Sequence, residues 1–552
     1  MCCWSKDWPK LIRPACKPPE RIIAHRLNTR SAFMTRWSPA LALFAGALTV
    51  FSFAPFGFWP LQIITMAVLF WLLLQQTSIK RSALIGWAYS FGWMLCSVYW
   101  LYISMHRYGG LPSWMAALAV ALLAAFIGGF AAMSTAGASW FRIRTKASHA
   151  LSLLVVFPAC WMLGEWLRGW VFTGFPWAVS GYAHTTGPLA GYAPVVGVYG
   201  LAWLAALLAG SLVLLPQKKM SALLILLLAA VGFGLKTITW TSPTGQPVSV
   251  RLLQGNVPQE MKFAPEQIQA TLTLYENLIR AAPADLIATP ETALPLLAHQ
   301  LPADYIERLQ TFARQADSHV ALGIPVADGP LQYANSVIGF TPASAAAPQA
   351  HLQANPQAYQ YRYDKHHLVP FGEFIPAGAR WFVEMMKIPL GDFTRGAPLQ
   401  PAFAVKDQWI MPNICYEDLF GEEIADQIAA SYFSGTPQPT ILLNMSNIAW
   451  FGDSIALPQH LQISQMRALE TGRPMLRATN TGATAVIDSK GRVVEQLPPF
   501  TRGVLAATVQ GASGWTPYIL LGNTLPVGLA LVMLGSIWLA RRKKAAENAD
   551  LP

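Results

Sequence analysis

The apolar positions of this chain form long unbroken runs up to residue 238 and again after residue 516, with short, interrupted runs between them. The long runs cover residues 38–54, 57–76, 82–105, 112–137, 149–168, 190–215, 220–238 and 517–540. Most are near the roughly 20 residues that a helix needs to cross a bilayer, so the pattern predicts a multi-pass α-helical membrane bundle of about eight spans. The first two runs are short and are separated by Pro55, Gly57 and Pro60, which leaves a re-entrant hairpin as an alternative.

Between these runs, the segment 246–513 alternates short β-rich stretches with helical ones. Strand patterns occur at residues 248–253, 285–288, 319–324, 333–340, 409–414, 440–443, 475–478, 483–488 and 502–508. Helical spacing of apolar residues occurs at 267–281, 303–316, 418–433 and 458–471. Strands that alternate with helices predict one layered α/β domain, and the Ala-, Pro- and Gln-rich stretch 342–358 is expected to be an exposed loop.

Charged residues give the predicted bundle an orientation. Only 12% of the residues are charged, against about 25% in a typical soluble protein. If each apolar run crosses once, the basic clusters all lie on one side, at Lys80-Arg81, at Arg142, Arg144 and Lys146, at Lys218-Lys219, and from Arg541 to Lys544. The positive-inside rule makes that side the cytoplasm and puts 246–513 outside, which in a bacterium is the periplasmic face of the inner membrane. The formal charge of +11 then follows from topology, and we expect no nucleic-acid partner.

The predicted boundaries are a basic tail at 1–36, the bundle at 37–240, the extracytoplasmic domain at 246–513, the final helix at 517–540 and a cytoplasmic tail at 541–552. The N-terminal tail lacks the apolar core of a signal peptide, and we assign it no function. Met34 lies shortly before the first apolar run and is an alternative start of translation. Glu165 and Arg168 lie in the fifth run, where charges are costly, so we expect them to pair within the bundle or to face a polar cavity.

Cys415 is the only cysteine between residues 246 and 513, which excludes a disulfide within that segment. It follows the predicted strand 409–414 and precedes Tyr416-Glu417-Asp418. A lone cysteine is more often a small buried hydrophobe than a reactive group. Its interpretation as a nucleophile therefore depends on the residues that accompany it.

Glu291 and Lys365 also fall at the ends of predicted elements, where a side chain is exposed while its backbone is held. Taken alone, Glu291 after Pro290 is typical of a turn or a helix cap, and most lysines are solvated charges. The adjacent His366 and His367 point to opposite faces of a strand, which disfavours a shared metal, so we expect no metal site.

The order of these residues resembles the nitrilase superfamily: Glu291, then Lys365 in the run Tyr-x-Lys-x-His-Leu-Val-Pro-Phe-Gly-Glu, then Cys415-Tyr-Glu. Three longer motifs are similar to those of the apolipoprotein N-acyltransferase family, namely Leu390 to Gly396 (LGDFTRG), Asn444 to Asp453 (NMSNIAWFGD) and Gln465 to Pro474 (QMRALETGRP). The fused bundle agrees with that family, and the resemblance extends from residue 38 to 540. It implies a nitrilase-like αββα sandwich for the segment 246–513.

The resemblance further implies a ping-pong N-acyltransferase with a Glu-Lys-Cys triad and no cofactor. Such an enzyme moves an acyl chain from a phospholipid, typically phosphatidylethanolamine, through a Cys415 thioester to the amine of a diacylglyceryl-cysteine, the last step of apolipoprotein maturation. Glu291 is then the general base, which requires a pKa raised toward neutrality. Lys365 stabilises the oxyanion, assisted by the backbone N–H of Tyr416.

Supporting and substrate-binding residues are expected around this triad. Glu373 would hold Lys365 by a charge-assisted hydrogen bond, and Tyr416 and Glu417 would shape the site. The candidate substrate-binding residues are Phe263, Trp381, Phe382, Met385 and Met386. The last four belong to an apolar run that we interpret as an arm dipping into the membrane surface, with a core helix as the alternative. Phe263 stands where the family often has tryptophan, which leaves its stacking role open.

Two other functions remain alternatives. A membrane-anchored carbon-nitrogen hydrolase would use the same triad on a small substrate with water as acceptor, but it needs neither an apolar arm nor a fused bundle. A transporter with an extracytoplasmic binding domain predicts charged or interrupted helices at membrane mid-depth, which are scarce here, and activity without Cys415. We therefore favour acyl transfer by a monomer whose partners are phospholipid, apolipoproteins and the lipid bilayer.

Overall fold

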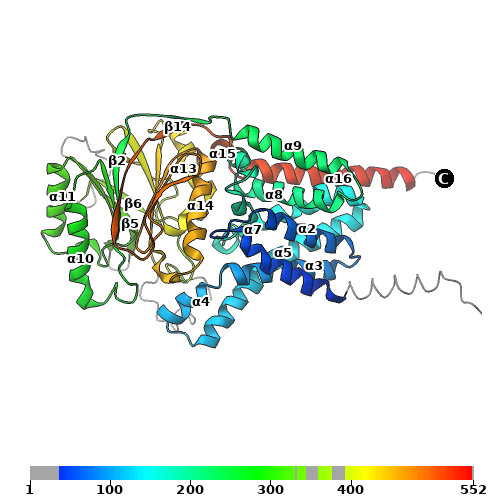
Figure 1. The fold of residues 1–552 in the computed structure, drawn as a ribbon, viewed down its shortest axis with the longest axis horizontal. Helices are drawn as coiled ribbons and strands as arrows, with labels where there is room; N and C mark the ends of the chain where they lie inside the picture. The colour runs from blue at the N-terminus through cyan, green and yellow to red at the C-terminus, as the bar shows by residue number, and fades with distance from the viewer. Residues whose placement is uncertain (1–35, 330–331, 343–358, 376–391, 550–552) are drawn as a thin grey trace, which may run out of the picture.

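The computed structural model describes residues 36–329, 332–342, 359–375 and 392–549. It has two parts, an α/β body and a helical bundle, and the C-terminus lies at the far end of the bundle (Figure 1). The N-terminal tail, the expected loop at 342–358 except its first residue, and the arm residues Trp381, Phe382, Met385 and Met386 lie outside the described residues.

Two six-stranded sheets form the centre of the α/β body. The first contains, in order, β13 (Gly503–Val509), β2 (Val248–Gln254), β3 (Leu286–Ala288), β4 (His319–Gly329), β5 (Gln332–Phe340) and β6 (Tyr361–Asp364). The second contains β12 (Val493–Gln496), β11 (Ala485–Ile487), β10 (Met475–Thr479), β9 (Ile441–Ser446), β8 (Gln408–Ile414) and β7 (Phe403–Val405). In each sheet three central strands are parallel, β2-β3-β4 and β8-β9-β10, and the outer strands pair antiparallel.

Helices cover the outer faces of both sheets and complete four layers. The helices α10 (Pro265–Arg280) and α11 (Tyr305–Gln315) pack buried residues such as Tyr275 and Leu309 against the first sheet. The helices α13 (Gly421–Ser434) and α14 (Ala456–Thr471) cover the second sheet. The inner faces of the two sheets share one apolar core, which includes Leu252 and Leu443. The expected αββα sandwich is therefore present, because each sheet has a buried apolar face on both sides.

The bundle contains a helix in every predicted apolar run. These are a helix at 36–48, α2 (Pro60–Leu74), α3 (Ile79–Ser97), α5 (Ser113–Thr145), the helical run His149–Arg168 that ends in α7 (Phe157–Arg168), α8 (Ala193–Leu214), α9 (Met220–Leu235) and α16 (Thr524–Ala549). Within the described residues, 4 helices are long and apolar enough to cross a membrane, and Pro60–Leu74 and Met220–Leu235 are shorter apolar helices. The bundle is thus observed, whereas the number of crossings stays a prediction.

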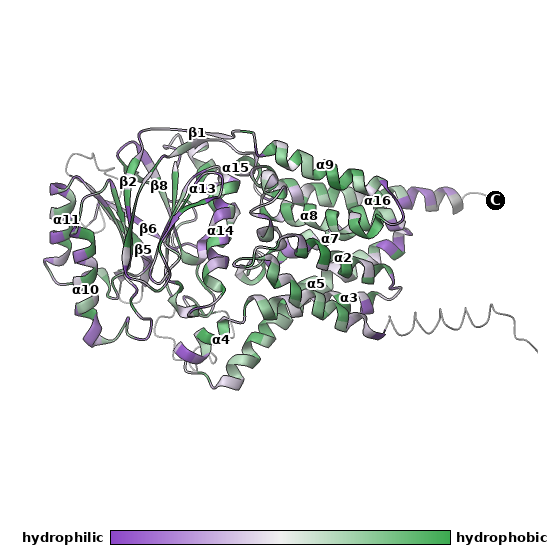
Figure 2. Ribbon diagram, viewed as in Figure 1, coloured by the Kyte–Doolittle hydropathy of each residue, from purple (hydrophilic) through white to green (hydrophobic). Residues whose placement is uncertain are grey.

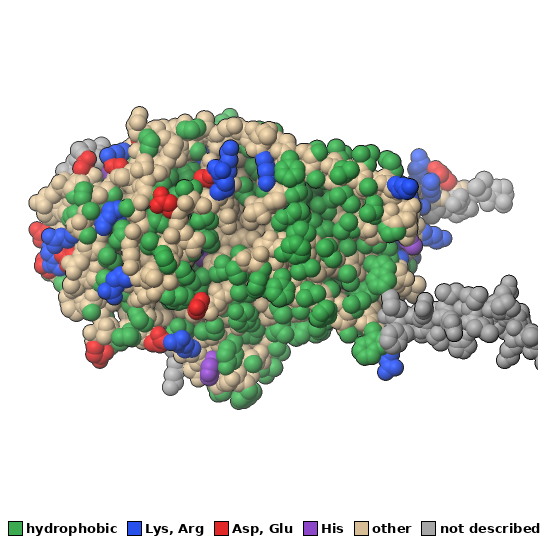
Figure 3. Space-filling view, viewed as in Figure 1, with side chains coloured by type: hydrophobic (Ala, Val, Ile, Leu, Met, Phe, Trp, Pro, Cys, Tyr) green, Lys and Arg blue, Asp and Glu red, His purple; other side chains and the backbone are tan. Residues whose placement is uncertain are grey.

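The bundle has a mainly apolar surface and the α/β body a more polar one, as expected of a protein that sits in a membrane. The bundle helices are hydrophobic along most of their length, and the end of α16 is hydrophilic (Figure 2). Hydrophobic side chains gather over the bundle, while charged side chains lie on the α/β body and at the opposite end of the bundle (Figure 3). A continuous apolar surface of this kind suits contact with lipid.

The last apolar run, 517–540, is divided in the structure. Gly522 adopts a φ of +51°, in the region that favours glycine, and separates α15 (Pro517–Leu521) from α16. Ile519 of α15 is buried with α13 in the core beneath the second sheet. The segment that leaves the body is therefore α16, which begins at Thr524 instead of 517.

Candidate active site

Glu291, Lys365 and Cys415 each lie just beyond the carboxyl end of a strand, β3, β6 and β8 respectively. Because β3 and β6 belong to the first sheet and β8 to the second, the site draws on both sheets. The Lys365 Nζ lies 3.1 Å from Glu291 Oε1. Charges on both residues shift the pKa of the Cys415 thiol. The structure therefore brings the three predicted residues together in one cluster.

The Glu291 carboxylate accepts hydrogen bonds on both oxygens. Asn335 Nδ2 lies 2.8 Å from Oε1, and the backbone N–H of Asn447 donates to Oε2 at 2.9 Å. Glu291 is 8% exposed, so these donors and Lys365 replace water around its charge. The carboxylate is fixed in one orientation with its charge compensated by protein groups.

The pKa of Glu291 differs from the sequence-based expectation. Burial raises it, but Lys365, Asn335 and Lys262 together outweigh burial and hold the pKa of this carboxyl below its usual range. The expectation of a raised pKa is wrong for the resting site, because it counted burial and not the lysines. Burial raises the pKa of the Cys415 thiol to about 12, so the resting pair is a thiol beside a carboxylate.

Glu373 and Asn335 connect the two reactive charges. Glu373 Oε1 accepts from Lys365 Nζ at 2.8 Å and from Asn335 Nδ2 at 2.8 Å. Its second oxygen accepts the backbone N–H of Val369 at 2.9 Å. Lys365 is 1% exposed and lies between two carboxylates, which raise its pKa against the effect of burial. Its ammonium therefore stays protonated at neutral pH.

Glu417 fixes the turn that carries Cys415. Cys415 begins the 3-10 turn Cys415–Leu419 with a φ of +53°, a conformation that a side chain rarely adopts without support. Glu417 Oε2 accepts the backbone N–H of Ile414 at 2.6 Å and the Tyr363 hydroxyl at 2.9 Å. Its Oε1 accepts the backbone N–H groups of His366 and His367 at 2.7 and 3.1 Å. One carboxylate thus ties the end of β6 to the end of β8, and burial raises its pKa to about 7.

The histidines bond to separate partners. His366 Nδ1 lies 2.8 Å from Gly396 O, and His367 Nδ1 lies 2.7 Å from Glu423 Oε1. Among the residues that the structure describes, no group of three His, Cys, Asp or Glu side chains could hold a metal ion.

A buried ionic group behind Cys415 was missed by sequence reasoning. Asp418 accepts from His460 Nε2 at 2.8 Å and from Arg477 Nη1 at 3.0 Å, and His460 Nε2 lies 3.3 Å from Cys415 O. All three side chains are almost fully buried. The available signal was Arg477, a charge inside an otherwise apolar core strand, since such a charge requires a buried partner.

Lys262 is a second buried charge beside the site that the sequence did not reveal. It lies in the turn before α10, next to the half-buried Phe263, and is 3% exposed. Its Nζ donates to the backbone oxygen of Glu291 at 3.4 Å. Only Phe263 was singled out in this segment, because a turn lysine normally points to solvent.

The turn that carries Cys415 is also bonded to the bundle. Hydrogen bonds join Tyr416 Oη to Gly174 O (2.9 Å), Tyr182 Oη to Leu419 O (3.2 Å), His367 Nε2 to Thr173 O (2.8 Å) and Trp177 Nε1 to Gln459 Oε1 (2.8 Å). The loop after α7 therefore lies directly against the turn that carries Cys415. The Tyr416 side chain bonds in this interface, while its backbone directly follows Cys415.

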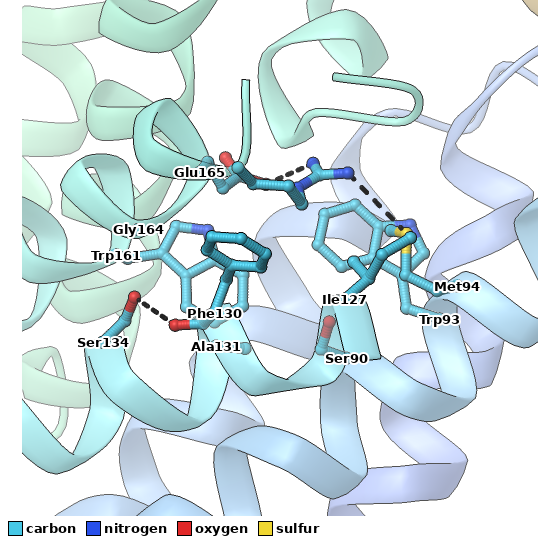
Figure 4. Close-up of a pocket in the computed structure, with 11 residues that line it drawn as sticks. Ser90, Trp93, Met94, Ile127, Phe130, Ala131, Ser134, Trp161, Gly164 and Glu165 are labelled. Carbon is cyan, nitrogen blue, oxygen red and sulfur yellow. Dashed lines mark hydrogen bonds and ion pairs between the residues drawn. The ribbon is translucent and has the colours of Figure 1, made fainter. Parts of the chain in front are cut away.

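Glu165 and Arg168 pair within the bundle, one of the two arrangements expected for them. Arg168 Nη2 lies 3.8 Å from Glu165 Oε1 and its guanidinium donates to Trp177 O at 2.8 Å. Glu165 accepts from Ser180 N at 3.0 Å. The pair lines a cavity with Trp93, Met94 and Phe130 among other residues (Figure 4). Its volume of about 20 Å³ has room for a water and none for an acyl chain.

Comparisons with known proteins cover nearly the whole chain. The Apolipoprotein N-acyltransferase N-terminal domain matches residues 45–211 and the Carbon-nitrogen hydrolase domain matches residues 249–516. An apolipoprotein N-acyltransferase of Ralstonia nicotianae is 48% identical over 92% of this chain and 94% of its own length. Those of Bordetella bronchiseptica and Vibrio cholerae are 42% and 37% identical over 90% and 95% of this chain, and over 95% and 99% of their own lengths. A solved amidase from Nesterenkonia sp. is 18% identical with a TM-score of 0.35, covering 48% of this chain and 92% of that one.

Proposed function

The chain belongs to the apolipoprotein N-acyltransferase family, and from this premise we propose that it transfers an acyl chain from a phospholipid through a Cys415 thioester to a lipoprotein amine. The observation that carries the proposal is the bonding of the nucleophile's turn to the bundle, above all Tyr416 Oη to Gly174 O at 2.9 Å. A thiol at the junction of an apolar bundle and a polar body meets substrates whose reacting groups lie at the membrane surface. A small polar substrate needs no such junction.

In the first half-reaction Cys415 attacks the ester carbonyl of the phospholipid. The Sγ–C bond forms, the thiol proton moves to Glu291, and the carbonyl electron pair becomes an oxyanion beside Lys365. As the Lys365 ammonium turns to the oxyanion, its interaction with Glu291 weakens and the pKa of Glu291 rises. This coupling lets a carboxylate with a lowered resting pKa accept a proton from a thiol of high pKa. Collapse of the intermediate returns the proton to the departing lysophospholipid oxygen.

In the second half-reaction the amine of the diacylglyceryl-cysteine attacks the thioester. Glu291 accepts a proton from the attacking nitrogen, and Lys365 again stabilises the oxyanion. When the intermediate collapses, the Sγ–C bond breaks, the amide forms and Glu291 returns the proton to Cys415, which leaves as a thiol. The two substrates use one site in turn, so the kinetics are ping-pong. Glu373 and Glu417 hold Lys365 and the nucleophile's turn in place throughout.

We propose phosphatidylethanolamine as the donor and a monomer as the working unit, and Phe263 remains a candidate contact for the acyl chain. Phe263 is half-buried and directly follows Lys262, which bonds to Glu291. An aromatic side chain at that place offers an apolar face next to the reacting groups.

The bundle is proposed to cross the bacterial inner membrane about eight times, with the α/β body on the periplasmic side. Two exposed lysines test this, Lys490 on the body and Lys218 between α8 and α9. In a variant without the native cysteines, we expect a membrane-impermeant maleimide to label K490C in intact spheroplasts. K218C should react only after lysis. Labelling of K218C in intact spheroplasts, or protection of K490C, would contradict this orientation.

The function itself is tested by following the product. The purified enzyme is incubated with phosphatidylethanolamine labelled in its acyl chains and with a diacylglyceryl-cysteine peptide. We expect the label in an amide at the peptide's N-terminus and an equal amount of lysophospholipid. A carbon-nitrogen hydrolase would instead leave the peptide amine free, and release of the label only as free fatty acid would refute acyl transfer. A peptide with an acetylated N-terminus is the matched control and should receive no label.

A further inference from the structure

Lys262 is a buried cation with little solvation. The turn between β2 and α10 places its side chain inside the body, 3% exposed. An ammonium has three N–H donors, and among the described residues its one hydrogen-bond acceptor is the backbone oxygen of Glu291, at 3.4 Å. A buried charge with so few bonds requires a nearby opposite charge. The carboxylate of the same Glu291 acts as that charge, raising the pKa of Lys262 against the effect of burial, although the two do not form an ion pair within 4.0 Å.

The charges of the site balance only when Lys262 is counted. Glu291 and Glu373 carry two negative charges, and both bond to the single ammonium of Lys365, at 3.1 and 2.8 Å. Without a second cation this buried group would hold a net charge of −1. Two buried carboxylates that share one cation take up a proton more readily, because like charges disfavour full ionisation. A protonated Glu291 could not accept the thiol proton.

We propose that Lys262 is a positioning residue that keeps Glu291 ionised and therefore competent as the base. The proposal rests on the base role of Glu291 in the proposed function. The electrostatics support it: Lys262 acts on Glu291 in the direction of a lower pKa. Burial lowers the pKa of Lys262 to about 8, against the effects of Glu291 and Cys415, so it carries its charge at neutral pH.

The same charge serves the tetrahedral intermediate. When the thiol proton has moved to Glu291, the site holds the oxyanion and Glu373 on one side and Lys365 and Lys262 on the other. The sum is zero before attack and zero in the intermediate, so the reaction moves charge without creating a net buried charge. Without Lys262 both states would carry −1, so its removal changes the two alike and acts on the rate through the protonation of Glu291.

Several other polar and charged groups surround Glu291. Lys365, Asn335 Nδ2 and the Asn447 N–H face its carboxylate, and Cys415 acts electrostatically on both lysines. Glu260, on the same turn as Lys262, bonds instead to Arg107 at 2.7 Å. Neutral removal of Lys262 therefore leaves Glu291 with Lys365 as its only neighbouring cation among the described residues.

The test is the pH dependence of a single turnover. Thioester formation is followed as a burst of lysophospholipid from pH 5 to 9 in wild type, Lys262→Met, Lys262→Arg and the control Lys490→Met, an exposed lysine. The acid limb is the part of the pH–rate profile in which the rate falls as the pH is lowered. We expect Lys262→Met to move this limb to higher pH by about one unit or more, because loss of a nearby positive charge raises the pKa of a carboxylate. Above the limb, the rate of the variant should approach that of wild type. Lys262→Arg should restore the limb and Lys490→Met should not move it. Glu417, whose pKa burial raises to about 7, is present in every variant, so a difference between their limbs reports on Lys262.

A second measurement avoids any need for lipid. Alkylation of Cys415 by iodoacetamide also requires removal of the thiol proton, and its acid limb should shift in the same way. Lys262→Gln replaces Lys262→Met if the latter does not fold. Equal loss of rate at every pH, with the limb unmoved, would overturn the proposal and leave Lys262 a purely structural residue. Glu291→Gln separates the base role of Glu291 from the positioning role of Lys262. If Glu291→Gln is active, Glu291 is not the base. If Glu291→Gln is inactive and Lys262→Met does not move the acid limb, only the role of Lys262 is refuted.

Discussion

Cys415→Ser is expected to lower the rate of acyl transfer by about 10³ or more while leaving the fold intact. A serine hydroxyl has a far higher pKa than a thiol, and the Glu291 carboxylate, whose own pKa is held low, cannot deprotonate it. Cys415 is half-buried, and the exchange of sulfur for oxygen changes little volume. The variant should therefore keep the melting temperature of wild type. The rate is measured as amide formation on a diacylglyceryl-cysteine peptide.

The matched control is Cys96→Ser, a half-buried cysteine in α3 far along the chain from the site. It should retain nearly wild-type transfer. Transfer by Cys415→Ser at a rate within tenfold of wild type would show that no thioester is needed. The proposed mechanism would then have to be abandoned, whatever the family.

Lys365→Met is expected to damage both catalysis and stability. The variant loses the oxyanion donor, which typically lowers the rate by about 10² to 10³. It also leaves Glu291 and Glu373 buried without their shared partner, and removal of one member of a buried ion pair typically costs about 3–5 kcal/mol. A fall in melting temperature should therefore accompany the loss of transfer. Both are measured on the detergent-purified enzyme.

Lys406→Met provides the comparison for Lys365→Met. Lys406 pairs with Asp285 at the surface, with its side chain 48% exposed. Surface pairs of this kind contribute about 0–1 kcal/mol, so this variant should melt near wild type and remain active. A Lys365→Met enzyme that keeps both its melting temperature and its activity would mean that Lys365 neither stabilises the oxyanion nor is needed to compensate the two carboxylates.

The strand ends could be predicted from the sequence because alternation and apolar runs locate strands, and reactive residues directly follow them. Glu291 and Cys415 follow predicted strands, and β8 and β10 lie within a residue or so of their predicted bounds, whereas Lys365 follows the edge strand β6, which was not predicted, and was singled out by its motif. The short edge strands β7 and β12 were missed, since their burial and pairing come from neighbours distant in sequence. The break at Gly522 that separates α15 from α16 was also missed, because a single glycine hardly changes the mean hydropathy of an apolar run.

The electrostatics of the site could not be predicted. A lysine in a turn, such as Lys262, is expected to be solvated from the sequence alone, but the fold buries it. Arg477 in β10 pairs with Asp418, which is distant in sequence, so this pair is recognised only in the structure. The lowered pKa of Glu291 follows from charges contributed by β6 and by the turn before α10, which are 74 and 29 residues away. Sequence patterns locate reactive side chains, whereas the charge states depend on which other side chains the fold brings beside them.

The central claim is that an acyl chain passes through Cys415, and intact-peptide mass spectrometry tests it most directly. Wild-type enzyme is incubated with phosphatidylethanolamine in the absence of an acceptor, quenched in acid and digested. We predict that the peptide containing Cys415 carries the mass of one acyl chain, that hydroxylamine removes it, and that adding a diacylglyceryl-cysteine peptide before quenching discharges it into amide. Unmodified Cys415 in an enzyme that still transfers the acyl chain to the peptide would contradict the account.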